Sequence, residues 1–438
     1  MLIRFLVSNF LSFHDEIEFS MIPGKTRSLP NHVVKGENRY DLDILRGAVI
    51  YGPNASGKSN LIKAIDFARN MILVGTSGQE AIARQAFKLT RTSMEQPSKF
   101  VFEFKSADRA YGYGFELDAR RIHSEWLYEI KRTTETMLFE RTSTPSGETS
   151  VEFGKLPVKN KKEMEFLQYV AMGTRTNQLF LRESIDRNVK FFEAAYKWFD
   201  EKLVIVFPSS KFLRLGAIGR DHQLSKTIVQ YLEQFGTGIC GFGLVETNPE
   251  QVFPKEMISE MLKKMQKDPI TLTVLNSDGE RFIVEISPDA EVKAHKLMLK
   301  HKMGDCDEET LLEMHEESDG TQRLLDLLPF LTFAQGDKVF IVDELDRSLH
   351  PKLSRQFVSA FLQHENHSQL IVTTHESSLL DFDLLRRDEV WFIEKDQNGA
   401  SSVYSLEEYT PRYDKDIEKG YLLGRFGAIP VLSHSALS

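Results

Sequence analysis

The alternation of apolar and polar residues divides the chain into two α/β stretches with a different middle. Strand-like patterns cover residues 1–13 and 100–129, and the turn residues inside the second stretch predict an antiparallel meander. The apolar run 45–51 ends in a glycine turn and is followed by an apolar-periodic stretch at 60–73, which predicts a buried strand leading into a helix. We place this N-terminal lobe at residues 1–154.

The middle block, residues 155–310, has a mainly helical pattern. Its helical stretches are 189–199, 223–235 and 254–267. One β-hairpin is predicted, because the runs 270–275 and 281–286 flank a turn that contains Asp278 and Gly279. The sequence has no sustained heptads, which excludes a long coiled coil. We expect an inserted, mainly helical lid that makes assembly or partner contacts.

The last part of the chain, residues 311–438, returns to an α/β pattern. Apolar runs at 339–342, 370–374 and 390–394 alternate with helical segments, as a parallel sheet requires. The whole chain is therefore predicted to be an α/β protein with a mixed sheet, in which two lobes enclose the inserted lid.

A glycine-rich motif follows the strand predicted at 45–51. It matches the pattern G-x-x-x-x-G-K-[ST] in the strand–loop–helix context that a phosphate-binding loop needs. Glycines let backbone N–H groups face phosphates, the lysine reaches the terminal phosphates, and the serine after it ligates magnesium. The residues expected to bind nucleotide here are Gly52, Pro53, Asn54, Ala55, Ser56, Gly57, Lys58, Ser59 and Asn60.

Two carboxylates, Asp343 and Glu344, end the apolar run 339–342. Asp343 can hold magnesium together with Ser59. Glu344 can orient the attacking water as the catalytic carboxylate, and Lys58 is a further catalytic candidate. A strand that ends in acidic residues is weak evidence alone. The sequence that follows, from Leu345 through Asp346 to Pro351, makes the assignment much more specific.

Two further segments are candidates for contacts with the terminal phosphate. Ser318, Gly320 and Gln322 lie at the start of a helical stretch, where a serine is equally expected as an ordinary helix N-cap. His375 ends the buried run 370–374, and a lone histidine at a strand end is usually structural. Their order along the chain, between and after the nucleotide motifs, favours a functional role for both.

In this order the motifs resemble those of the SMC-like ABC ATPases of bacterial abortive-infection and anti-phage defence systems. Three segments are similar to the sequence motifs of that family: Asn9-Phe-Leu-Ser-Phe, Asp343-Glu-Leu-Asp-Arg-Ser-Leu-His-Pro and Gly424-Arg-Phe-Gly-Ala-Ile-Pro. The resemblance implies an ABC/SMC-head-like P-loop ATPase. It covers about the first 150 residues and those after Glu317, but little of the block between them.

The resemblance also implies roles for single residues. Ser318, Gly320 and Gln322 would form the signature that binds the ATP of a second subunit. Asp346 would lie in the D-loop, and His375 would be the catalytic switch histidine. Gln178 is a candidate for the Q-loop glutamine that contacts magnesium, although an ordinary surface glutamine is at least as consistent with the sequence. ATP and Mg²⁺ are the expected cofactors.

Composition indicates which partners and which cellular location to expect. The net charge of −9 argues against a chain coated with nucleic acid, although a local basic patch is compatible with it. Two cysteines, Cys240 and Cys306, are too few for a disulfide framework, and no apolar run reaches the roughly 18 residues of a membrane span. We expect a cytoplasmic protein without membrane contact.

Three functions are compatible with these observations. The first is a homo-oligomeric ATPase, at least a dimer, that controls a separate effector protein, a nuclease of the Toprim type, in response to a phage trigger. The second is a DNA-engaging head for repair or tethering, and the third is a scaffold that binds ATP without turnover. Glu344 argues against the third. Some relatives carry a fused Toprim nuclease, but this chain ends soon after Pro430, so we expect no nuclease activity in it.

Overall fold

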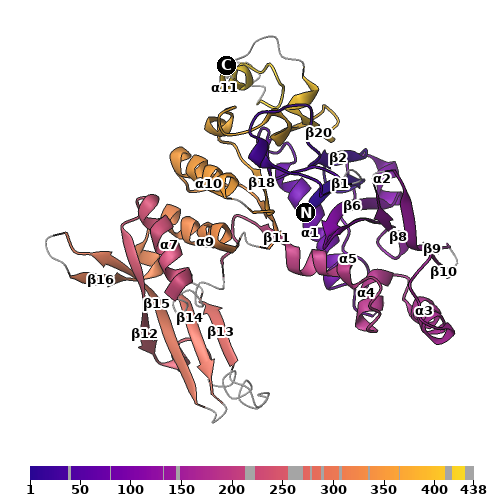
Figure 1. Cartoon of the computed structure of the whole chain (residues 1–438), viewed down its shortest axis with the longest axis horizontal. Coiled ribbons are helices and arrows are strands. Elements are labelled where there is room, and N and C mark those ends of the chain that lie inside the picture. Colours follow the sequence, from indigo (N-terminus) through magenta and orange to yellow (C-terminus); the bar gives the residue numbers. More distant parts are fainter. Residues whose placement is uncertain are drawn as a thin grey trace. The chain divides into compact units, whose positions relative to one another are not determined.

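The computed structural model describes most of the chain and divides it into two compact units. The described residues are 1–37, 41–78, 80–131, 133–144, 148–212, 222–254, 270–276, 279–287, 291–304, 308–333, 336–364, 366–409 and 417–429. Unit 1 comprises Met1–Pro208, Gln335–Leu345 and Phe361–Ser438, and unit 2 comprises Ser209–Ala334 and Asp346–Ala360. Figure 1 shows the elements of both units along the chain.

The first sheet of unit 1 is antiparallel and has seven strands in the order β10-β9-β8-β7-β6-β1-β2. Its strands are β1 (Leu2–Ser8), β2 (Ile17–Ser20), β6 (Ser98–Ser106), β7 (Arg109–Leu117), β8 (Ile122–Ile130), β9 (Glu135–Ser143) and β10 (Thr149–Phe153). Along β6, Phe100, Phe102 and Phe104 are buried, whereas the residues between them are half-exposed. This period of two places one face of the sheet in the core and the other outward, and it confirms the predicted meander.

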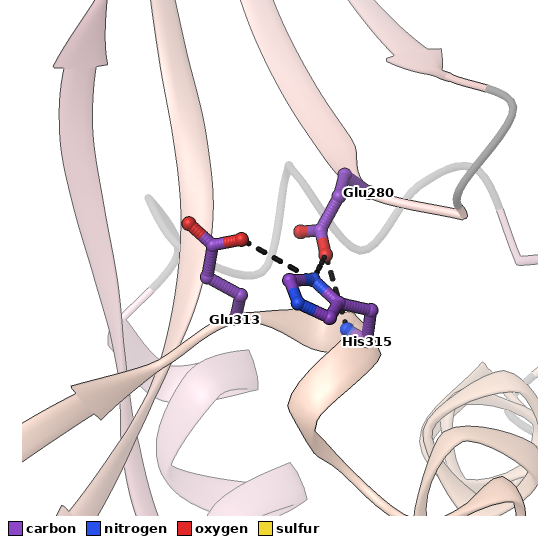
Figure 2. Close-up of side chains that lie close together, drawn as sticks. All are labelled: Glu280, Glu313 and His315. Atoms are coloured by element: carbon purple, nitrogen blue, oxygen red, sulfur yellow. Dashed lines mark hydrogen bonds and ion pairs between the residues drawn. The ribbon is translucent and has the colours of Figure 1, made fainter.

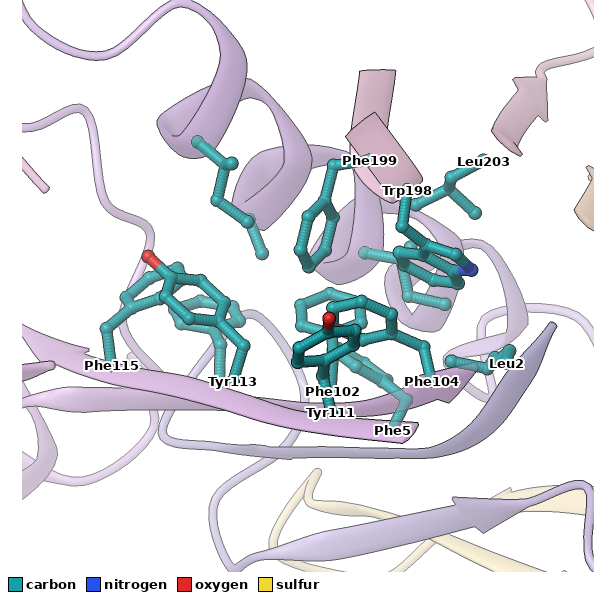
Figure 3. Packing of buried hydrophobic residues seen from close by; sticks show 14 of the residues in the cluster. Leu2, Phe5, Phe102, Phe104, Tyr111, Tyr113, Phe115, Trp198, Phe199 and Leu203 are labelled. Atoms are coloured by element: carbon teal, nitrogen blue, oxygen red, sulfur yellow. The ribbon is translucent and has the colours of Figure 1, made fainter. Parts of the chain in front are cut away.

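Aromatic rings fill the core on the buried face of this sheet (Figure 3). Trp198 stacks on Phe104 with ring centroids 4.4 Å apart, and Phe199 meets Phe102 edge-on at 5.1 Å. Trp198 and Phe199 come from a short π-helix, Trp198–Lys202, that lies in sequence directly before strand β11. The abundance of phenylalanine in the sequence is therefore explained in large part by core packing.

The second sheet of unit 1 has six strands in the order β11-β17-β18-β5-β19-β20. They are β5 (Gly47–Tyr51), β11 (Leu203–Val206), β17 (Val339–Val342), β18 (Gln369–Thr373), β19 (Val390–Lys395) and β20 (Ser401–Ser405). All neighbours pair in parallel except β19 and β20. Every residue of β5, β17 and β18 is buried, as expected of parallel strands covered on both faces. The sheet confirms the predicted α/β class.

Helices and short elements complete unit 1. The helices are α1 (Lys58–Leu73), α2 (Arg91–Glu95), α3 (Lys161–Gly173), α4 (Phe180–Asp186), α5 (Glu193–Lys197) and α11 (Ile417–Leu422); the 3-10 turns are Pro30–His32, η5 (Ser377–Leu379), Arg387–Glu389 and Leu406–Glu408; the short strands are β3 (Val33–Val34) and β4 (Ile44–Leu45). Helix α1 continues the chain from β5 and packs on the antiparallel sheet, where the ring of Phe67 lies 5.4 Å from that of Phe100. It thereby links the two sheets of this unit.

Unit 2 contains a five-stranded antiparallel sheet and helices. Its elements are α7 (His222–Gln234), β12 (Ile239–Thr247), the 3-10 turn Pro249–Gln251, β13 (Ile270–Leu275), β14 (Arg281–Ile286), β15 (Val292–Lys302), β16 (Glu309–Leu312), η4 (Met314–Glu316), α9 (Asp319–Phe333) and the first part of α10 (Pro351–Gln363). Strand β15 pairs with β12, β14 and β16. Helix α7 confirms the helix predicted at 223–235, and β13 and β14 confirm the hairpin.

The middle block differs from the expectation in two respects. A mainly helical lid is wrong for residues 239–312, where the described elements are almost all strands. The glycines of β12 and the lysines and histidines of β15 interrupt the alternation on which strand prediction depends. The compact insert also begins at Ser209 instead of 155, because α3, α4 and β11 belong to unit 1. The helix predicted at 254–267 lies outside the described residues except for its first residue.

Candidate nucleotide-binding site

The loop between β5 and α1 has a backbone that few residues adopt. Gly57 has a φ of 119° and Ala55 one of 62°. A Cβ atom at Gly57 would lie 2.5 Å from the hydroxyl oxygen of Ser401 and 2.9 Å from that of Ser12. Only glycine fits both this φ and this close approach. Gly57 is also the N-cap of α1 and has no side chain to cap it, so the helix N-terminus is suited to an anion.

Lys58 is buried inside the loop, with 5% of its surface exposed. Its Nζ donates to the carbonyl oxygens of Gly52 at 2.7 Å and Pro53 at 3.1 Å. The Nδ1 atom of His375 lies 3.5 Å from the same Nζ. The structure therefore brings together the lysine of the loop and the histidine at the end of β18, more than 300 residues apart in sequence.

The end of β17 carries Asp343 to the same edge of the sheet. Its Oδ1 accepts hydrogen bonds from the Ser59 hydroxyl at 3.2 Å and the Thr373 hydroxyl at 2.6 Å. Thr373 Oγ1 in turn accepts the N–H of Glu344 at 2.8 Å, and Glu344 has a φ of 49°. Strand β18 lies between β5 and β17, so its threonine connects Asp343 with the backbone of Glu344.

Two serines far apart in sequence hold the loop from outside. Ser401 on β20 donates its hydroxyl to the carbonyl of Ser56 at 2.5 Å and its N–H to the carbonyl of Ser12 at 2.7 Å. The hydroxyl of Ser12 accepts from Asn60 Nδ2 at 2.8 Å. We call Ser12 and Ser401 the loop clamp. Sequence reasoning missed the clamp and Thr373. Ser12 lies within the noted Asn-Phe-Leu-Ser-Phe turn and Thr373 just before the noted His375, whereas Ser401 has no local signal.

These residues fit a nucleotide phosphate and a magnesium ion. The hydroxyl of Ser56 is buried in the loop and has no hydrogen-bond partner among the described residues, which leaves one donor for an incoming oxygen. The ammonium of Lys58 lies against loop carbonyls that a phosphate can replace as its partner. The oxygens of Ser59 and Asp343, 3.2 Å apart, are the hard ligands that magnesium prefers.

Gln178 does not belong to this site, and its assignment as a magnesium contact is wrong. It lies at the other end of α1, where its Oε1 accepts the N–H of Thr76 at 3.1 Å. The 16 residues of α1 place that end roughly 24 Å from Ser59. Gln178 is buried and its backbone carbonyl accepts a hydrogen bond from Arg141. Its role is to fix the turn that follows α1.

Comparison with known proteins agrees with this geometry. Residues 48–233 and 268–381, more than half of the chain, match the family described as "AAA domain, putative AbiEii toxin, Type IV TA system". The chain belongs to this family. The family and the loop geometry together make it a P-loop ATPase, and the predicted fold class is confirmed. None of the curated proteins matches the chain.

Several solved structures are similar to this ATPase at low sequence identity. They are an Smc head bound to the C-winged helix domain of ScpA (13% identity, TM-score 0.41, 93% of this chain and 99% of that chain), an SMC head domain from Thermotoga maritima (15%, 0.33, 92% and 98%), and an Smc head with an extended coiled coil bound to the C-terminal domain of ScpA derived from Pyrococcus furiosus (12%, 0.35, 93% and 97%).

The signature segment lies in unit 2, at the start of α9. Ser318 Oγ accepts the N–H of Thr321 at 3.1 Å, as an N-cap does, and Gln322 Nε2 donates to the carbonyl of Glu317 at 3.1 Å. A Cβ at Gly320 would lie 2.8 Å from the carbonyl oxygen of Ser348, which follows Asp346 in the predicted D-loop. The cap is real, and it leaves the signature role of Ser318, Gly320, Gln322 and Asp346 as a prediction.

Unit 2 also contains three side chains that resemble a metal site, Glu280, Glu313 and His315 (Figure 2). Lys296 Nζ lies 2.6 Å from Glu313 and 3.5 Å from Glu280, so a lysine already neutralises these carboxylates. The hydrogen bond to Glu280, at 2.7 Å, raises the pKa of His315 and favours its charged form. We therefore interpret the cluster as an ion-pair network before α9. Among the described helices of the chain, none is long and apolar enough to cross a membrane.

Proposed function

We propose that this chain binds ATP with Mg²⁺ and hydrolyses it to ADP and phosphate. The observation that carries the proposal is the contact set at one sheet edge, where Ser59, Asp343 and Thr373 form a continuous hydrogen-bonded row next to Lys58. The row joins the loop, the Asp343 strand and the strand between them. If this row of hydrogen bonds served only to stabilise the fold, it would not need the positive φ of Gly57 in the neighbouring loop.

Each residue has a separate task in this proposal. Lys58 and the first N–H groups of α1 bind and orient the phosphates, and Ser59 and Asp343 hold the magnesium ion. Glu344 orients the attacking water, and the hydrogen bond from its N–H to Thr373 fixes the backbone from which its side chain projects. His375, next to Lys58, contacts the terminal phosphate. When bound, Mg²⁺ neutralises charge on the phosphates.

The ATPase proposal is tested with Glu344→Gln, which removes the carboxylate charge and keeps its shape. We expect kcat to fall about 100-fold or more while nucleotide binding persists, since the carboxylate acts on the water alone. The measurement is steady-state phosphate release together with binding of a fluorescent ATP analogue. Glu95→Gln, an exposed position on α2, is the matched control. A near-normal kcat in Glu344→Gln would contradict the assignment.

The catalytic unit in this proposal is a head-to-tail pair. One chain has one phosphate-binding loop and one signature segment, and in ABC ATPases these serve different nucleotides. Two copies then share two ATP molecules across an isologous interface. Mixing a Lys58→Ala chain with a Ser318→Arg chain should restore part of the activity, because one of the two composite sites is intact. Lack of any gain over either variant alone would argue against the shared site, provided that one intact site suffices for turnover.

The biological role we propose is the sensing and regulatory subunit of a cytoplasmic anti-phage defence system. Support comes from the matched family, whose description names a putative AbiEii toxin. Since the motifs also resemble those of anti-phage defence ATPases, we propose AriA, the ATPase subunit of the PARIS system, as the named relative. In this role a separate effector, a Toprim-type nuclease, performs the damaging chemistry. The ATP-bound pair controls the effector by binding it more or less tightly than the open form does.

This role is tested by purification from cells that express the neighbouring genes. We expect the chain to co-purify with a neighbouring product, and Glu344→Gln to abolish protection against phage while leaving that association intact. The purified chain alone should show no nuclease activity with Mg²⁺ or Mn²⁺. A nuclease activity that disappears with Lys58→Ala, or a closed pair that binds duplex DNA tightly, would favour a DNA-engaging function instead.

A further inference from the structure

The outward face of the antiparallel sheet has a hollow that the nucleotide site does not use. Strand register places Glu103 opposite Gly112, and Gly112 opposite Tyr128. In the next row, Gly114 lies opposite Trp126, which lies opposite Glu140. The glycines in the middle of both rows have no side chain of their own, so the side chains of Ile130 and Trp126 lie over Gly112 and Gly114.

The hollow has a volume of about 310 Å³ and aromatic and acidic walls. Trp126, Tyr128 and Ile130 from β8 form its apolar side, and Glu103, Glu135 and Glu140 supply carboxylates. A second hollow, of about 510 Å³, also has Ile130 in its lining. The second hollow is acidic as well, since Glu37, Asp108 and Glu129 line it, although Arg109 and Lys131 do so too.

Two of these carboxylates have no cation beside them in the described part of the chain. Among the described residues, neither Glu135 nor Glu140 forms an ion pair with lysine, arginine or histidine, and Glu140 accepts a hydrogen bond from the Tyr128 hydroxyl. Partial burial, that hydrogen bond and the charges of Glu140 and Glu135 raise the pKa of Tyr128 to about 12. The phenol therefore stays a neutral donor, and the hollow keeps an uncompensated negative charge.

The third carboxylate shows which cation this surface suits. Arg4 binds Glu103 through two nearly parallel hydrogen bonds, from Nε to Oε2 at 2.6 Å and from Nη2 to Oε1 at 2.9 Å. A guanidinium is thus already seated at the rim of the hollow. Ordinary sheet packing explains one feature, since the indole of Trp126 covers Gly114. It does not explain why Glu135 and Glu140, on the same face, have no cationic partner among the described residues.

We propose that this hollow binds an arginine side chain presented by a basic segment of a partner protein. A planar guanidinium stacks on Trp126 or Tyr128 and hydrogen-bonds a carboxylate in two places at once, whereas the ammonium of lysine is a point charge that does neither as well. Phosphate backbones are repelled by Glu135 and Glu140, so the hollow itself does not suit nucleic acid. The inference does not depend on ATP turnover.

The experiment uses the full chain and a tetra-arginine peptide with blocked ends. Trp126 is a selective reporter, because the other two tryptophans, Trp198 and Trp391, are 0% and 7% exposed. Titration of the peptide should change the fluorescence of the wild type, and Trp126→Phe should remove that change. The double variant Glu135→Gln/Glu140→Gln should weaken binding about ten-fold, because each lost contact is a charge-assisted one. Higher salt should weaken it further in the wild type.

Controls separate this site from general attraction to an acidic protein. Glu165→Gln on α3 removes one charge from an exposed position outside the hollow and should leave binding within two-fold. Tyr128→Phe keeps the ring and should bind almost normally, whereas tetra-lysine should bind several-fold more weakly than tetra-arginine. ATPase activity should be unchanged in the double variant. Equal peptide binding by the wild type and the folded double variant, or equal loss in Glu165→Gln, would overturn the proposal.

Discussion

The carboxylates at the nucleotide edge of the parallel sheet and on the outward face of the antiparallel sheet have opposite surroundings. At the nucleotide edge, Asp343 is buried and accepts two hydroxyl hydrogen bonds. On the outward face, Glu135 and Glu140 have no cationic partner within the described chain. The first carboxylate is preorganised for a small ion that the hydroxyls help to hold. The second pair leaves its charge available to a larger ligand.

The difference teaches that the two surfaces depend on geometry to unequal degrees. A magnesium ion needs oxygens within a few tenths of an ångström of their ideal positions, so the hydroxyls of Ser59 and Thr373 fix the carboxylate in advance. A guanidinium on a flexible side chain tolerates displacement, and the hollow supplies walls without a tight hydrogen-bond row. Variants that disturb hydrogen bonds should therefore affect the first surface strongly and the second weakly.

Among the variants that separate the two surfaces, the largest effect is expected for Thr373→Val, which keeps the shape and removes the hydroxyl. Asp343 loses a donor in buried surroundings, and the N–H of Glu344 loses an acceptor in partly buried ones. Such unpaired groups cost about 1–3 kcal/mol, so kcat should fall roughly 5- to 150-fold. Steady-state ATPase measurements over a range of Mg²⁺ concentrations check this.

Thr374→Val is the matched control for that prediction, because its hydroxyl accepts from Glu376 and does not touch Asp343. Thr374→Val should lower the thermal stability of the protein but leave kcat nearly unchanged. Equal losses of kcat in both variants would show that Thr373 acts only by packing, and the contrast between the two surfaces would then lose its basis.

A smaller effect is expected for the loop clamp. Ser401→Ala removes the hydroxyl that holds the carbonyl of Ser56, which costs about 1 kcal/mol, or roughly five-fold. The loop binds phosphates, so KM for ATP should rise while kcat stays within two-fold. Ser402→Ala, the exposed neighbour on the same strand, should change neither. Steady-state kinetics of both variants measure KM and kcat. A fall in kcat without a rise in KM in Ser401→Ala would contradict the prediction.

The smallest effect concerns the outward face. Glu140→Gln should lower the pKa of Tyr128 from about 12 towards its ordinary 10, because a negative neighbour is removed. In the wild type the raised pKa means that the stabilising contribution of neutral Tyr128 is complete below pH 10 and is lost as pH rises to about 12. Ultraviolet titration of the tyrosines, with Tyr128→Phe to assign the signal, measures the shift. An unchanged titration in Glu140→Gln would contradict it.

Local motifs in the sequence determined much of the nucleotide site. The loop around Gly57 and Lys58 and the carboxylates after β17 are each encoded within a few residues, and parallel strands bring their ends to one edge wherever the sheet forms. The same locality made the meander and the hairpin of β13 and β14 predictable. It also made Ser318 readable as a helix cap, which the structure contains.

Tertiary structure alone decided the rest. Gln178 was wrongly assigned to the magnesium site because its position in the sequence does not give its distance from Ser59. The packing of α3 and α4 places it at the far end of α1. Ser401 reaches the loop across 345 residues through the pairing of β19 and β20, and the hollow exists only because register aligns glycines with aromatic and acidic residues from separate strands. Periodicity reports which way a side chain faces along one strand, whereas register between strands decides which side chains meet.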